Sequence, residues 1–197
     1  MRSLLVTLFA LTPAAALAAP NLSPIDTSKA PSCAAGADIP ADAKIDKPAY
    51  EAHISFAHCA ASVRLQALQG LADDDAGMKA VEGAIDPSIA ALDEVIKAGD
   101  PQYAIIAEGL KAQLYVAAAV RMRNSIPGIT MTTVGEPLAD HDRRHQALEP
   151  KIKPWLDNAS AGFERVKAAA ASKPELASNP VVKAAVDAAN APARMPK

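Results

Sequence analysis

Apolar residues recur at steps of three and four along most of the chain after residue 47, a spacing typical of α-helices. The longest such run covers residues 101–126 and is apolar around most of its circumference. Asp100 and Pro101 favour a helix start, and Pro127 favours its end. A helix this apolar has to be buried on most sides, so we expect residues 101–126 to form the central helix of the fold.

Other helical patterns flank this run. They cover residues 47–72, 77–98, 138–171 and 180–189. Three prolines lie inside these patterns: Pro87, Pro150 and Pro154. Because an interior proline removes a hydrogen bond and clashes with the preceding turn, we expect kinks or breaks at these positions.

The composition favours helix packing over sheets, since half of the chain is apolar, much of it alanine, and only 4% is aromatic. Short connections make the first three helices antiparallel neighbours. We therefore predict an all-α fold. It is an up-and-down antiparallel four-helix bundle with an extended N-terminal arm and a short extra C-terminal helix.

The first residues have the features of a secretory signal peptide. Arg2 precedes an apolar stretch at residues 4–11, and small residues follow at 16–18. The apolar stretch is too short to span a bilayer, and no later membrane span is expected. We predict a signal peptide at 1–19, an arm at 20–46, a bundle domain at 47–190 and a disordered tail at 191–197. The mature protein would be periplasmic or secreted.

Two cysteines, Cys33 and Cys59, lie in the predicted mature chain. An oxidising compartment favours a disulfide between them, which would tie the arm to the first helix. In the chain-entropy model a loop of this length contributes about 3 to 4 kcal/mol. Two separate buried thiols are the alternative interpretation.

Four histidines occur in two pairs, His53 with His58 and His141 with His145. The pairs fall at different depths of an antiparallel bundle, so one four-histidine site is not expected. His141 and His145 are four residues apart and share a helix face, which makes them the candidate metal ligands. The alternative is that both are polar positions near a bundle end, hydrogen-bonded to neighbours or water. The C-x-x-C-H sequence of covalent haem attachment is absent.

Charged residues of both signs gather at the same predicted bundle end. Arginines there suggest an anion site, whereas the aspartates suggest surface ion pairs of small energy, which we expect instead. The residues are Arg121, Arg123, Arg143, Arg144, Asp73, Asp74, Asp75, Asp140 and Asp142.

The loop at residues 127–137 carries Ile129, Met131 and Val134 between threonines and glycines. A loop of this length covers a bundle end or forms an interaction surface. We expect it to cap the bundle, and it is also the candidate interaction loop.

The chain has 20 basic and 22 acidic residues, a balance that does not favour nucleic-acid binding. It contains no catalytic motif such as G-x-S-x-G or H-E-x-x-H. We predict a non-enzymatic module that binds another envelope protein, with no cofactor. The alternative is a metal- or haem-binding periplasmic bundle.

Overall fold

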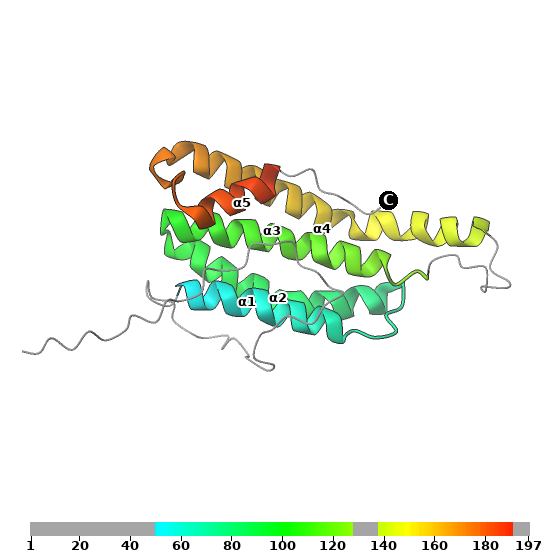
Figure 1. Ribbon diagram of the computed structural model, residues 1–197. Coiled ribbons are helices and arrows are strands. Elements are labelled where there is room, and N and C mark those ends of the chain that lie inside the picture. Colours follow the sequence, from blue (N-terminus) through cyan, green and yellow to red (C-terminus); the bar gives the residue numbers. More distant parts are fainter. Residues whose placement is uncertain (1–49, 128–137, 191–197) are drawn as a thin grey trace, which may run out of the picture.

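The computed structural model describes residues 50–127 and 138–190, and this part of the chain is an all-α bundle without strands. The elements are α1 (Tyr50–Ala67), α2 (Asp75–Ala98), α3 (Pro101–Arg123), α4 (Leu138–Ser172), a single 3-10 turn (Pro174–Leu176) and α5 (Pro180–Asn190). Successive helices run in opposite directions (Figure 1). The all-α prediction is confirmed.

The predicted central helix is α3, which packs against α1, α2, α4 and α5. Figure 1 shows α3 between the α1–α2 pair on one side and the α4–α5 pair on the other. The substantial contacts of α4 are with α3 and α5, and α1 contacts α2 and α3. Six large side chains of α3 and its C-terminal connection are almost fully buried: Ile105, Ile106, Leu110, Leu114, Met122 and Ile126.

Local signals fix the junction between α2 and α3. Gly99 adopts a left-handed conformation with φ of 79°, which ends α2. The Asp100 carboxylate then accepts hydrogen bonds from the backbone N–H groups of Gln102 and Tyr103, at 3.1 and 3.4 Å. Pro101 occupies the first turn of α3, where its missing N–H costs nothing. The sequence-based boundary is therefore confirmed.

α1 is shorter than the predicted range 47–72, and it buries only one of two adjacent apolar rows. It ends at Ala67, and Gly70 turns the chain with φ of 58°. The row with Ile54, Ala57 and Leu65 is buried, but Phe56 of the neighbouring row is 47% exposed. The reason is that only α2 and α3 contact α1 substantially, so one of its two apolar rows lacks a helix against it.

The interior prolines do not break their helices. α2 continues through Pro87, and α4 runs for 35 residues through Pro150 and Pro154. All three prolines are exposed. Pro87 and Pro150 have no N–H to donate to the carbonyl groups of Gly83 and Gln146, four residues earlier, and these two residues are exposed as well. Because these carbonyl groups lie on the water-facing side, solvent can satisfy them and the helices persist.

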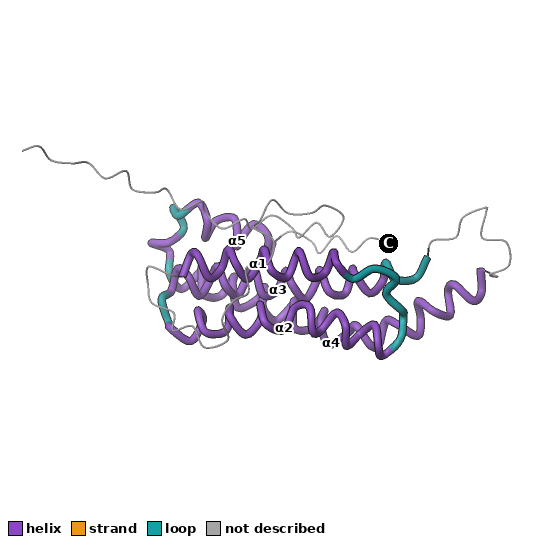
Figure 2. Tube along the Cα trace, turned by 90° about the horizontal axis from the view of Figure 1, so that it is seen from below, coloured by secondary structure: helices purple, strands orange, loops and turns teal. Residues whose placement is uncertain are grey.

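The three- and four-residue apolar steps within residues 138–171 coincide with the buried face of α4. Leu148, Ile152, Trp155 and Val166 are at most 6% exposed. The N-terminal turns of α4 project beyond the end of α3, as both views show (Figures 1 and 2). α4 therefore combines a segment inside the bundle with a segment that extends past it.

Candidate functional site

An open groove of about 280 Å³ lies between the first turns of α3 and the last turns of α4. Ile105 and Val166 line it and are 2% and 0% exposed. Pro101, Ala104 and Ala169 complete the apolar lining. The groove forms because small side chains on both helices leave space above the buried Ile105 and Val166.

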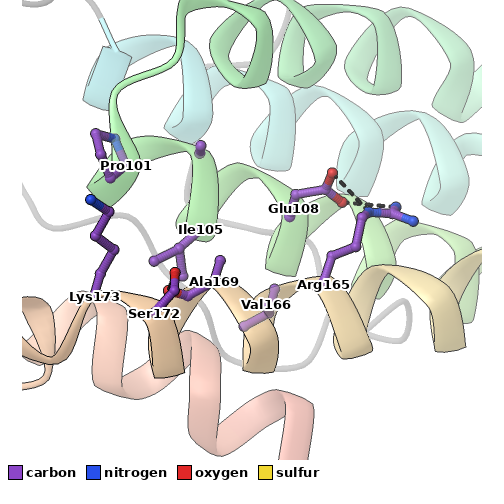
Figure 3. A pocket seen from close by; sticks show the side chains of 9 residues that line it. Pro101, Ile105, Glu108, Arg165, Val166, Ala169, Ser172 and Lys173 are labelled. Atoms are coloured by element: carbon purple, nitrogen blue, oxygen red, sulfur yellow. Dashed lines mark hydrogen bonds and ion pairs between the residues drawn. The ribbon is translucent and has the colours of Figure 1, made fainter.

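Charged groups lie at both ends of the groove (Figure 3). At one end, Nε and Nη2 of Arg165 donate to the two carboxylate oxygens of Glu108 at 3.0 and 2.9 Å. These hydrogen bonds raise the pKa of the Arg165 guanidinium. At the other end Lys173 is exposed, close to Pro101. None of the ion pairs among residues 50–127 and 138–190 includes Lys173.

Close packing of small residues holds the helices together beside the groove. A Cβ atom added at Gly109 would lie 3.4 Å from the Cβ of Ala185 on α5. One added at Gly162 would lie 3.0 Å from the Cβ of Ala112 on α3. Glycine therefore allows α3, α4 and α5 to approach closely at this end of the bundle.

The predicted metal candidates lie side by side in the early turns of α4. The ring centroids of His141 and His145 are 4.6 Å apart, with an angle of 61° between the planes. The two side chains are half-buried, as expected for residues in line with Leu148 and Ile152. Nδ1 of His141 is buried without a hydrogen-bond partner, and its nearest carboxylate, that of Asp142, is 3.7 Å away.

His53 and His58 do not join this pair. Both are half-buried on α1, and burial lowers the pKa of His58. Among the described residues there is no group of three or more histidine, cysteine or acidic side chains that could hold a metal ion.

The arginines of this bundle end are paired, so the anion-site interpretation is not supported. Arg144 donates to Asp73 at 2.7 Å, and Arg143 pairs with Asp140 at 2.6 Å. Arg121 donates to the backbone carbonyl groups of Leu65 and Leu68, at the C-terminal end of α1. The expected self-neutralising pairs are therefore present.

Glu149 is a partner that the sequence pattern did not single out. Nε and Nη2 of Arg123 donate to its two carboxylate oxygens at 2.7 and 2.6 Å. These hydrogen bonds lower the pKa of Glu149, and a hydrogen bond from Arg144 lowers that of Asp73. The pair of Arg123 with Glu149 thus links α3 to α4. The pair of Asp73 with Arg144 links the segment between α1 and α2 to α4.

Two other predicted features fall wholly or partly outside the described residues. Cys59 is half-buried on α1 and is not a free thiol, but Cys33 lies in the undescribed N-terminal part, so their bridge stays a prediction. On a helix Cys59 projects from the same side as Phe56 and Val63, opposite the buried Ala57 and Ala61 row. A bridge there would hold the arm on the outer face of α1.

The candidate interaction loop, with Ile129, Met131 and Val134, also lies outside the described residues. Its role as a cap or an interface remains a prediction. The signal peptide and the C-terminal tail fall outside them too.

α3 is long and apolar enough to cross a membrane by length and composition alone. Within the bundle, however, it contacts four other helices. This packing accounts for its apolar composition, because a central core helix meets the same criteria. The absence of a membrane span remains a prediction.

Comparison with protein-family models, with curated proteins and with solved structures gives no significant match. The sequence pattern did not predict the groove. Its only local signal was the small residues Ala104 and Ala169, which lie near Ile105 and Val166 in the sequence.

Proposed function

We propose that this protein is a non-enzymatic interaction module of the cell envelope, which binds a protein partner in the α3–α4 groove. The groove carries this proposal because it joins an apolar floor to an exposed lysine without an ion-pair partner in the described chain. Its volume of about 280 Å³ lies at the lower limit for small-molecule pockets, and its open shape suits a few side chains of a protein.

The proposed occupant is an amphipathic helix or extended segment of the partner. Its small apolar side chains would contact the accessible lining residues Pro101, Ala104 and Ala169, and an acidic side chain would meet Lys173. Burial of apolar surface supplies the affinity, and the charge pair orients the segment.

Export by the signal peptide at 1–19 is part of the same proposal. It supplies the oxidising compartment in which Cys33 and Cys59 would be bonded. Mass spectrometry of natively purified protein should show a cleaved leader and a mature chain two protons lighter than its reduced form. Two free thiols, or an uncleaved leader, would contradict the envelope assignment.

Site-specific photo-crosslinking tests the groove. A benzoylphenylalanine at Ala169 should give a partner adduct in cells. The same probe at Ala168, the exposed neighbouring residue, should give little. Lys173→Glu should weaken the Ala169 adduct by charge repulsion. Equal adducts from both probe positions would place the partner elsewhere, the loop with Ile129, Met131 and Val134 being the next candidate.

A further inference from the structure

We propose that His141 and His145 form a two-nitrogen site for a divalent transition-metal ion such as Cu²⁺, Ni²⁺ or Zn²⁺, with Asp142 as its supporting carboxylate. The site is at the opposite end of the α3–α4 pair from the groove. It does not depend on partner binding in the groove. Water molecules would complete the coordination, so no third protein ligand is required.

The ring separation fits two neighbouring ligands of one ion. A metal–nitrogen bond of 2.0 to 2.1 Å places each imidazole centroid about 3.2 Å from the metal. Two rings at 90° to 110° around the ion then have centroids about 4.5 to 5.2 Å apart. The observed separation of His141 and His145 is 4.6 Å. A rotation of the side chains that keeps this separation would aim one nitrogen of each ring at a shared ion.

The same geometry argues against haem. Two axial histidines bind opposite faces of the iron, which would separate their centroids by about 6.4 Å. Residues four apart on one helix project on the same side and cannot reach opposite faces of a haem. This pair therefore fits a metal ion better than a haem with two histidine ligands.

The local charges also favour a cation. Glu149, Asp140 and Asp73 are each paired with an arginine. Asp142 has no lysine or arginine partner within the described chain, and its Oδ1 lies 3.7 Å from Nδ1 of His141. One carboxylate is thus left uncompensated next to the two rings.

Asp142 also explains the buried Nδ1 of His141, which has no hydrogen-bond partner. Metal-bound histidines usually donate their second ring N–H to a carboxylate, which fixes the tautomer and orients the ring. If Nε2 of His141 binds the ion, Nδ1 carries the proton and Asp142 is the acceptor. A small rotation that shortens the 3.7 Å separation would complete this hydrogen bond.

Titration of the mature chain with Cu²⁺ tests the site, because copper binds such nitrogen ligands most tightly among these ions. We expect one ion per chain, with two imidazole nitrogens visible by electron paramagnetic resonance. His141→Gln and His145→Gln should each lower the affinity about tenfold or more and remove one nitrogen from the spectrum. Asp142→Asn should lower it about tenfold.

The matched control is the second histidine pair. His53 and His58 are five residues apart and diverge by about 140° around α1, so His53→Gln and His58→Gln should leave the copper affinity unchanged. Circular dichroism confirms that each variant is folded. The proposal is overturned if the double variant of His141 and His145 binds copper as tightly as the wild type, or if the control variants cause the same loss. Neither result bears on crosslinking at Ala169, so this site and the groove are tested separately.

Discussion

The two halves of α4 are attached to the rest of the molecule by different kinds of contact. In the inner half, residues 152–172, Gly162 and Val166 pack closely against α3, and Arg165 adds one ion pair with Glu108 of α3. In the outer half, residues 138–151, charged pairs with Asp73, Asp75 and Arg123 add to the burial of Leu148. One continuous helix therefore depends mainly on close packing at one end and to a larger extent on charge at the other.

This difference matters because the two kinds of contact respond to different changes. Close packing tolerates almost no added volume but is insensitive to salt. Exposed ion pairs tolerate substitution, contribute little, and are screened by salt. The inner half should therefore be the rigid part of the scaffold. The outer half, which carries the histidine pair, should respond more strongly to salt and pH.

The largest expected effect is from Gly162→Val. Its Cβ alone would lie 3.0 Å from Ala112, so the branched side chain forces α4 away from α3. Overpacking of this kind costs about 3 kcal/mol. Chemical denaturation measures the loss. Gly83→Ala is the control, because Gly83 is exposed with open space around it and alanine there should stabilise α2 by about 0.5 to 1 kcal/mol. An unchanged free energy of unfolding for Gly162→Val would show that the close approach of α4 to α3 is not required.

The loop that precedes α4 provides the next test. If Ile129 and Met131 cap the bundle end, Ile129→Ser or Met131→Ser should each cost about 1 to 3 kcal/mol through lost apolar burial. Thermal denaturation measures this. An unchanged melting temperature together with lost partner binding would instead identify the loop as an interface, and would move the proposed binding surface to the outer end.

The ion pair of Arg123 with Glu149 should contribute less. Arg123 is 15% exposed but Glu149 is 45% exposed, so solvent screening reduces the interaction. A double-mutant cycle with Arg123→Gln and Glu149→Gln should give a coupling of about 1 kcal/mol, decreasing at high salt. The exposed Lys153–Asp157 pair is the control and should give less than about 0.5 kcal/mol. Equal coupling in both cycles would remove the distinction between the outer half and ordinary surface pairs.

Acid should loosen the outer half first, with a small effect on global stability. Hydrogen bonds from Arg123 and Arg144 hold the pKa of Glu149 and Asp73 below their ordinary values of 4.5 and 3.8. Their stabilising contribution is therefore complete above about pH 5 and is lost as the pH falls through the lowered pKa values. Hydrogen exchange between pH 5 and pH 3, corrected for intrinsic rates, should show protection lost earlier around Glu149 than around Gly162. Simultaneous loss of protection around Glu149 and Gly162 would show that both halves of α4 respond to acid alike.

The sequence by itself determined the helical class and most of the core. Alternating three- and four-residue steps identified the buried face of α4 from Leu148 to Val166 and the central position of α3. Asp100, Pro101 and Gly99 fixed a helix junction through backbone hydrogen bonds that involve only neighbouring residues. These features are predictable because periodicity and capping act within a few residues.

The tertiary structure alone decided what depends on neighbouring helices. It determined that Phe56 faces outward, that the chain continues as helix through Pro87, and that the polar side chain of Gln113 is buried. It also paired Glu149 with Arg123 and brought Ala104 and Ala169 together around the groove. Sequence spacing gives the face of a helix on which a residue lies. Which residues of another helix oppose that face depends on how the helices pack, since the interacting residues are far apart in the chain.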